Sequence, residues 1–409
     1  MTKEALSDDT PDAPTPVPLL RPADGLPPVV ADRTALDHTA AAFGGGSGPV
    51  AVDAERASGF RYSQRAYLVQ LRRDGAGTAL IDPIPLGSDL SPLAPALTGP
   101  EWVLHAASQD LACLAEVGLT PSRLFDTELA ARLAGMPRVG LGPLVEQLLG
   151  LSLEKGHGAA DWSRRPLPED WLVYAALDVE VLVELRDVLA GELAAQGKLE
   201  WALQEFEAVR TAPPPAPRAE PWRRLSGVHK LRKPRLLAVA RALWEARDQL
   251  AAERDIAPGR VLPDSAIIAA AAAEPATAQA LAGMPTFRGR AQRRLTSYWF
   301  AALEKAYALD PAEYPRSSPV SDGPPPVSRW SDRDPDAAAR LAAARAAVAD
   351  VGEQWKVPVE NLLQPDLLRR VCWGPPADGD IRSALRAGGA RAWQIDLLAE
   401  RLEKAMAGS

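Results

Sequence analysis

The sequence predicts an α/β domain built on a mixed β-sheet, followed by domains made almost wholly of helices. Apolar runs of strand length, bounded by turn residues, alternate with amphipathic stretches up to about Val209. Beyond that point the helical pattern continues, and proline-rich segments interrupt it. A chain of 409 residues is also long enough for two or three domains.

The α/β domain is predicted over residues 28–211, and local patterns justify its elements. Residues 1–27 are rich in Asp, Pro and Thr and are predicted to be a disordered tail. A short helix at Leu36–Phe43 ends in a glycine-rich turn. Short apolar runs then predict strands at Val50–Val52, Ala66–Leu71, Thr78–Asp82, Trp102–His105 and the start of RLFDTELAARLAG. Helical patterns cover Leu90–Leu97, Ser108–Val117, the second half of RLFDTELAARLAG, LGPLVEQLLG and most of 168–209.

Two proline-rich linkers divide the rest of the chain. Residues 212–221 (APPPAPRAEP, with Ala212 first) read as a stiff linker of polyproline type, and residues 311–334 form a second linker. Between them, residues 222–310 are predicted to be an all-helical domain, with LLAVARALWEARDQLAAERD as its clearest amphipathic helix. Residues 335–409 form another helical block.

Composition narrows the class of protein. The chain lacks a run of 18 apolar residues, and its N-terminal residues lack the pattern of a signal peptide, so neither a transmembrane helix nor secretion is expected. Cys113 and Cys372 are far apart and are not spaced like zinc ligands. Two buried, reduced thiols and a cytoplasmic protein are therefore expected.

Charge is distributed unevenly. The whole chain has a net charge of −7, whereas residues 221–310 carry fifteen Lys and Arg against eight Asp and Glu. A basic domain within an acidic chain favours local contact with nucleic acid, although a solvated helical face would have the same composition. The candidate phosphate-binding side chains form two clusters: Lys230, Arg232, Lys233 and Arg235, and Arg288, Arg290, Arg293 and Arg294.

Five residues from three segments suggest a metal site. Asp53 and Glu55 lie two apart on a predicted strand and therefore point to the same face. Tyr174 and Asp178 lie one helical turn apart, and Asp110 follows the strand that begins at Trp102. Converging carboxylates repel one another unless cations join them, and hard Mg²⁺ or Mn²⁺ prefers such oxygen ligands.

In order and rough spacing, these residues resemble the DEDD 3′-5′ exonucleases. Residues 28–310 resemble bacterial ribonuclease D, most closely in the K-x5-DW-x-x-RPL…YAA-x-DV run from Lys155 onward. Residues 222–310, with LPD at Leu262–Asp264 and RGRAQRR, resemble the helicase-and-ribonuclease-D C-terminal (HRDC) domain. Residues 335–409 are interpreted as a second, diverged HRDC-like domain. The resemblance implies a ribonuclease H-like exonuclease domain (mixed sheet flanked by helices) followed by all-α HRDC domains.

The same resemblance implies roles for the five residues. Asp53 would bridge two divalent metal ions, Glu55 and Asp178 would hold the ion that binds the attacking water, and Asp110 would serve the second ion through water. Tyr174 would orient the attacking water. The other DEDD subclass has a histidine five residues before the last acid; Val173 stands there, so this chain is identified as a member of the tyrosine subclass.

Several neighbouring residues allow two readings. Arg56 stands where many relatives have an apolar residue that seats the terminal base, and it could contact a phosphate instead. Lys155 could meet a phosphate or be a solvated loop lysine, and His157 could be incidental. Asp126 could support the site or cap the next helix. Asp161 and Trp162 are expected to anchor a turn.

The sequence therefore predicts a metal-dependent 3′-5′ exoribonuclease that releases 5′-mononucleotides from structured RNA. Transfer-RNA precursors are implied as partners by the resemblance, and a monomer is favoured. A DNA-directed 3′-5′ exonuclease is the alternative within enzymes, because the same site serves both polymers. A non-catalytic RNA-binding adaptor is the alternative outside them, and the five intact site positions disfavour it.

Overall fold

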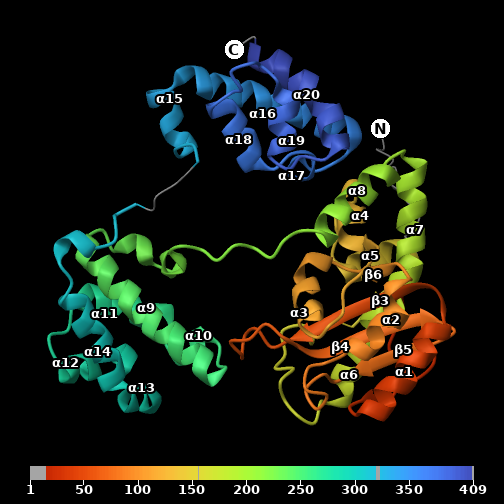
Figure 1. Cartoon of the computed structure of the whole chain (residues 1–409), viewed down its shortest axis with the longest axis horizontal. Coiled ribbons are helices and arrows are strands. Elements are labelled where there is room, and N and C mark those ends of the chain that lie inside the picture. Colours follow the sequence, from red (N-terminus) through yellow and green to blue (C-terminus); the bar gives the residue numbers. More distant parts are fainter. Residues whose placement is uncertain (1–14, 155, 319–322, 408–409) are drawn as a thin grey trace, which may run out of the picture.

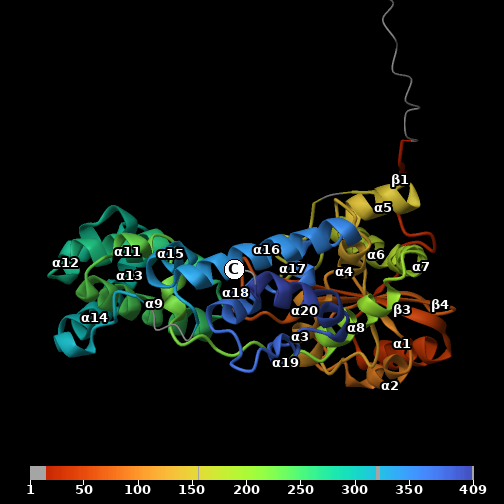
Figure 2. The ribbon, with the colours of Figure 1, turned by 90° about the horizontal axis from the view of Figure 1, so that it is seen from above.

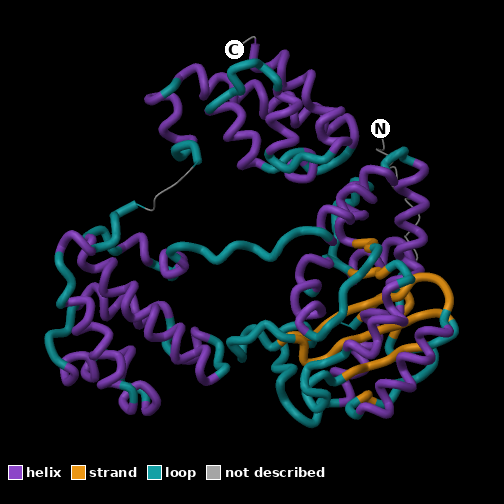
Figure 3. The backbone as a smooth tube through the Cα atoms, viewed as in Figure 1, coloured by secondary structure: helices purple, strands orange, loops and turns teal. Residues whose placement is uncertain are grey.

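A computed structural model describes residues 15–154, 156–318 and 323–407. Figure 1 shows an α/β domain at the right, a middle helical domain at the left and a C-terminal helical domain at the top. Figure 3 shows that the strands belong to the α/β domain and that an extended segment leads from it to the middle domain. The predicted fold class, a mixed sheet flanked by helices and followed by helical domains, is confirmed.

A six-stranded mixed sheet forms the centre of the α/β domain, in the order β2-β5-β4-β3-β6-β7. β3 pairs antiparallel with β4 and parallel with β6, so it lies inside the sheet with neighbours on both sides. Val50, Ala51 and Val52 of β3 are fully buried, which explains the continuous apolar run in the sequence. The strands are β2 (Val29–Val30), β3 (Ser47–Arg56), β4 (Ala66–Asp74), β5 (Gly77–Ile81), β6 (Trp102–Leu104) and β7 (Leu124–Asp126).

Helices cover the sheet and bring the C-terminal part of the domain back to β3. α6 contacts β3, β4 and β5, while α7 contacts β3 and β6. α8 contacts β7, and Phe206 of α8 packs on Phe125 of that strand with ring centroids 4.7 Å apart. The helices are α1 (Arg33–Gly45), α2 (Ala94–Thr98), α3 (Leu111–Glu116), α4 (Thr127–Leu133), α5 (Leu141–Leu149), α6 (Glu169–Glu180), α7 (Leu182–Ala195) and α8 (Leu199–Arg210).

The N-terminal segment differs from its prediction. Residues 1–14 lie outside the described part of the chain, but residues 15–27 are not a disordered tail. β1 (Val17–Leu19) pairs in parallel with β8 (Leu151–Leu153), and Figure 2 shows it beside α5. The Ala23 amide also donates to Glu180 Oε1 at 3.3 Å. Composition suggested disorder because the partner strand lies more than 130 residues away in sequence.

Two predicted helices are shorter and less regular than their patterns suggested. The 90–97 segment forms a 3₁₀ turn at Ser91–Leu93 followed by α2, because its prolines remove backbone donors. The 108–117 segment is a 3₁₀ turn at Ala107–Gln109 followed by α3, with Asp110 at the junction.

In the two helical domains, the first three main helices begin at positions that differ by a constant 101 residues. α9 (Pro234–Arg254) and α16 (Pro335–Trp355) have 21 residues each, and both end in a left-handed residue, Asp255 or Lys356. A four-residue helix follows in each domain, α10 (Pro258–Val261) or α17 (Val359–Leu362), and then a longer one, α11 (Asp264–Ala273) or α18 (Pro365–Trp373). The remaining helices are α12 (Ala278–Gly283), α13 (Arg290–Arg294), α14 (Thr296–Tyr307), α15 (Trp330–Arg333), α19 (Ile381–Ala387) and α20 (Ala392–Ala407).

The C-terminal domain shares a hydrophobic core with the α/β domain, whereas the middle domain has its own core. Trp393 stacks on Trp201 of α8, with ring centroids 5.0 Å apart and planes within 12°. The buried Glu205 carboxylate accepts from Trp393 Nε1 at 2.8 Å and pairs with Arg391. These contacts fix the C-terminal domain on α8.

No helix in the described part of the chain is long and apolar enough to cross a membrane. Cys113 and Cys372 are both buried free thiols, and burial raises the pKa of Cys113 to about 12.

Candidate active site

Two of the predicted acids lie on the central strand. Asp53 and Glu55 occupy the C-terminal half of β3, opposite Gln70 and Leu68 of β4. Their side chains point to the same face because residues two apart on a strand do so. Glu55 is 7% exposed and Asp53 is half-buried. The strand therefore presents two carboxylates at a point with little access to water.

α6 supplies the tyrosine and the third acid. It packs across β3, so Asp178 faces the carboxylates of that strand. One oxygen from each of Asp53, Glu55 and Asp178 lies within 4.8 Å of the others. The Tyr174 hydroxyl is hydrogen-bonded to the Asp178 carboxylate, which follows from their one-turn spacing.

A tight turn places Asp110 at the same cavity. The turn begins at Ala106, which has a left-handed conformation with φ of 58°. Asp126, at the end of β7, accepts from the backbone amides of Ala106 at 3.1 Å and Ala107 at 2.9 Å. The same carboxylate accepts from Glu128 N at 3.0 Å and so caps α4. The sequence left two readings of Asp126 open, and the structure shows that this residue both caps a helix and fixes the turn before Asp110.

The five residues line one cavity of about 430 Å³. The cavity is also lined by His105, Gln109, residues 141–143, Leu153, Glu154, Gly156 and Gly158. Sequence reasoning missed His105, Gln109 and residues 141–143 because no charged pattern marks them. A second cavity of about 490 Å³, lined by Leu20, Arg21 and one face of α6, shares Tyr174 and Asp178 with the first.

Burial and mutual repulsion disfavour the ionised carboxyl groups. Burial, with smaller contributions from Asp53 and its neighbours, raises the pKa of Glu55 to about 10. Burial raises the pKa of Asp53 to about 6 and, with repulsion from Asp53, that of Asp110 to about 7. The pKa of Asp178 is also raised, chiefly by burial. Three carboxylates with oxygens within 4.8 Å of one another, one buried and two half-buried, fit hard divalent cations, which would relieve this repulsion.

Arg56 lines the acidic cavity and faces Asp110. Its guanidinium lies 3.3 Å from the Asp110 carboxylate, with 26% of the side chain exposed. Arg56 thus offsets part of the negative charge on the Asp110 side of the cavity.

The turn before α6 packs against Tyr174. The His157 ring lies edge-on to the Tyr174 ring, with centroids 5.7 Å apart, and 3.6 Å from the Asp170 carboxylate. Trp162 is fully buried and its Nε1 donates to the His157 carbonyl at 3.1 Å. The Asp161 carboxylate accepts from Ser163 N at 3.3 Å, as expected of a turn anchor. His157 therefore has a packing role that its sequence context did not reveal, while Lys155 lies outside the described residues.

The basic side chains of the middle domain lie away from this cavity on that domain's surface. All eight are exposed. Arg235 pairs with Glu274 at 2.6 Å, and Arg288 Nε donates to Gly283 O at 3.0 Å. The structure leaves their role in binding nucleic acid as a prediction.

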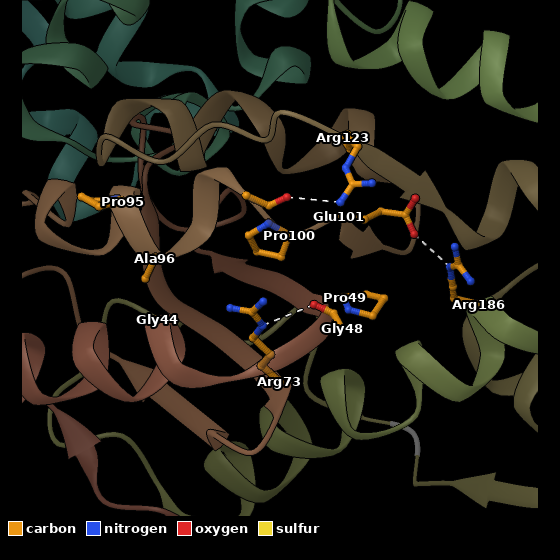
Figure 4. Close-up of a pocket in the computed structure, with 11 residues that line it drawn as sticks. Gly44, Gly48, Pro49, Arg73, Pro95, Ala96, Pro100, Glu101, Arg123 and Arg186 are labelled. Carbon is orange, nitrogen blue, oxygen red and sulfur yellow. Dashed lines mark hydrogen bonds and ion pairs between the residues drawn. The ribbon is translucent and has the colours of Figure 1, made fainter.

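A further hollow of about 530 Å³ lies at the opposite end of β3, near Gly48 and Pro49 (Figure 4). Arg73 Nε donates to the Gly48 carbonyl at 3.3 Å, and Arg186 Nε donates to Glu101 at 2.9 Å. Arg73 thus joins β4 to β3, and Arg186 joins α7 to the residue before β6; neither lines the acidic cavity.

Family models match three parts of the chain. Residues 29–194 match the model described as 3′-5′ exonuclease, and residues 237–303 match the HRDC domain. Residues 323–406 match a model described as 3′ to 5′ exonuclease C-terminal domain.

The relatives found by sequence are ribonucleases D. That of Gluconacetobacter diazotrophicus is 33% identical over 285 residues, covering 68% of this chain and 71% of the relative. That of Zymomonas mobilis is 34% identical over 276 residues, covering 65% and 70%. The ribonuclease D of a Shewanella species is 39% identical over 209 residues, covering 49% and 53%.

Solved structures extend the similarity to nearly the whole chain. A protein from Bifidobacterium adolescentis is 39% identical with a TM-score of 0.90, covering 96% of this chain and 100% of that one. Escherichia coli RNase D, described as an exoribonuclease involved in structured RNA processing, is 27% identical with a TM-score of 0.68, covering 93% and 98%. Together with the acidic cavity and the order of the domains, these similarities show that the chain belongs to the ribonuclease D family of 3′-5′ exoribonucleases.

Proposed function

We propose that this protein removes nucleotides one at a time from the 3′ ends of structured RNA, with transfer-RNA precursors among its substrates. The observation that carries this proposal is the convergence of the Asp53, Glu55 and Asp178 carboxylates, with the Tyr174 hydroxyl hydrogen-bonded to Asp178. The E. coli relative processes structured RNA by its description, which supports the substrate class. We also propose that the protein acts as a monomer and is cytoplasmic.

Two divalent ions, Mg²⁺ or Mn²⁺, are proposed as cofactors. Asp53, Glu55 and Asp178 would hold one ion, Asp53 would also reach the second, and Asp110 would serve that second ion. When bound, such ions activate a water and stabilise the departing oxygen of a phosphodiester. The raised pKa values of the carboxyl groups support this assignment, because cations favour the ionised forms that burial disfavours.

Tyr174 is proposed to orient the attacking water. Burial and the charge of Asp178 raise the pKa of Tyr174 above its usual value, so the phenol remains protonated near neutral pH. The hydrogen bond to Asp178 places the hydroxyl oxygen at the carboxylate cluster. Arg56 is proposed to meet a substrate phosphate once Asp110 is occupied by a cation, since both compete for the same carboxylate.

The remaining domains are proposed to bind RNA. The exposed clusters around Lys230 and Arg290 would contact phosphates without reading sequence. Lys155 is proposed to contact a phosphate too, as the resemblance to ribonuclease D implies. The 101-residue offset between α9–α11 and α16–α18 supports the proposal that residues 335–409 are a diverged second HRDC-like domain.

One degradation experiment tests the proposed function. Purified protein is incubated with a 3′-extended RNA and a matched DNA, each labelled at the 5′ end, with Mg²⁺, Mn²⁺ or a chelator. A ladder shortening by single nucleotides on RNA, abolished by the chelator, is expected. A ladder on DNA as well would favour the DNA-directed alternative, and no ladder with either metal would favour the adaptor.

A further inference from the structure

The loop that follows β3, the strand that carries Asp53 and Glu55, is bound by the HRDC domain. β3 ends at Arg56 and β4 begins at Ala66, so residues 57–65 come directly after Asp53 and Glu55. In Figure 1 this loop extends from the α/β domain towards α10. We call residues 57–65 the docking loop.

Three hydrogen bonds join the main chain of the docking loop to the end of α9 and to α10. The Asp255 carboxylate accepts from Ser63 N at 2.8 Å. Ala257 N donates to the Phe60 carbonyl at 3.0 Å, and Arg260 Nε donates to the Gly59 carbonyl at 2.7 Å. Because these bonds hold backbone atoms at three places, they fix the path of the loop.

Side chains reinforce the same contact. Arg65 lies 3.3 Å from Asp255, and the Tyr62 hydroxyl donates to Asp248 at 3.1 Å. The Arg260 guanidinium lies over the Phe60 ring, 4.0 Å from its centroid, in a cation–π contact. Asp255 and Arg260 thus each bind both the backbone and a side chain of the docking loop.

The docking loop also contacts the turn before α6 and the hydrophobic cluster beneath that helix. Arg61 Nε donates to Ser163 Oγ at 2.8 Å, in the turn before α6. Ala57 and Phe60 belong to the hydrophobic cluster that contains Trp162 and Tyr174. A displacement of the docking loop would therefore reach both β3, which carries two metal-binding acids, and the packing beneath α6.

We propose that the HRDC domain positions the active site through the docking loop, with Asp255 and Arg260 as positioning residues. This inference rests on the proposed function. If the HRDC domain served RNA affinity alone, loosening this contact would change only the binding of long RNA. If it positions the site, the rate must fall even for a substrate too short to reach the basic clusters.

The backbone conformation of Asp255 allows its carboxylate to be removed without straining the chain. Asp255 is left-handed, with φ of 46°, where glycine is unstrained, so Asp255→Gly deletes the carboxylate without disturbing the end of α9. Glu274→Gly is the matched control, because Glu274 ends α11 of the same domain with φ of 43° and does not touch the docking loop in the contacts described. Arg260→Ala is a second variant. The Arg260 side chain is exposed, so the domain should stay folded without it, and circular dichroism checks this.

The experiment uses the full chain with a 5′-labelled RNA dinucleotide and a 20-nucleotide RNA, and it measures kcat and KM together with hydrogen exchange of the docking loop. We expect Asp255→Gly and Arg260→Ala to lower kcat on the dinucleotide by about 10-fold or more, because displacements of about 1 Å can cost about 100-fold. Exchange of the docking-loop amides should accelerate in both variants. Glu274→Gly should match the wild type in both measurements.

An unchanged kcat on the dinucleotide, with KM raised only for the longer RNA, would overturn the inference and leave the HRDC domain as an affinity module. Unchanged exchange in the docking loop would overturn it as well, even if kcat fell. A wild-type protein that fails to degrade either RNA would instead overturn the proposed function, and the exchange data would still report on the contact itself.

Discussion

Replacing Tyr174 with phenylalanine separates the orientation of water from the binding of metal. The variant keeps the ring, which packs against the ring of His157, and removes only the hydroxyl bonded to Asp178. None of the clustered carboxylates at Asp53, Glu55 and Asp178 is lost, so the metal titration should be nearly unchanged. The affinity for RNA should also be similar, because the hydroxyl acts mainly in the transition state.

The rate of hydrolysis should fall by about 10²–10⁴-fold, the usual contribution of a positioned group acting on a proton or water. This corresponds to about 3–5 kcal/mol in the activation free energy. The free energy of unfolding should change far less, by about 1 kcal/mol for one lost hydrogen bond.

Three measurements on this variant are independent: metal titration, RNA affinity and single-turnover rate. Tyr298→Phe is the matched control, since it removes a tyrosine hydroxyl that donates to Ala246 O at 2.8 Å in the HRDC domain. A full single-turnover rate for Tyr174→Phe would refute the reasoning, because the tyrosine would then be a packing residue without a part in the reaction.

Further outcomes follow from the same geometry. Asp53→Asn should abolish hydrolysis yet preserve or raise the melting temperature without metal, because it removes one of several repelling charges; a sharp fall would mark a structural role. The pKa of Asp110 is raised to about 7, so the stability that its protonated form contributes is present below about pH 4 and is lost as the pH rises through 7. With a chelator present, the melting temperature should therefore decline between about pH 4 and 7, and less steeply in the Asp110→Asn variant. Added Mg²⁺ should counter the decline. Glu205→Gln should destabilise the protein by about 3 kcal/mol in chemical unfolding, because it leaves Arg391 without its buried carboxylate, and an unchanged midpoint would show that the domain contact contributes little. Replacing four exposed arginines of the HRDC domain together with glutamine should weaken RNA binding; they are Arg288, Arg290, Arg293 and Arg294. The slope of log affinity against log salt concentration should become shallower by about 0.7 per lost phosphate contact. An unchanged slope would identify a merely solvated face.

Local patterns in the sequence were sufficient to predict the mixed sheet and the helical domains and to single out the five candidate residues. Side-chain period made this possible: two residues apart on a strand for Asp53 and Glu55, and four apart on a helix for Tyr174 and Asp178. The resemblance to DEDD exonucleases then predicted that the three segments carrying these residues come together at one site. The fold class is confirmed, while the roles of these residues remain proposals to be tested.

Tertiary structure alone decided the contacts between segments distant in sequence. The pairing of β1 with β8, the bond from Asp126 to the turn at Ala106 and the grip of Asp255 on the docking loop join partners that no local pattern connects. Each uses backbone groups, which every residue carries, so the side-chain sequence gives little sign of the partner. Sequence periodicity determines which face of an element is buried, but only the packed chain determines what that face meets.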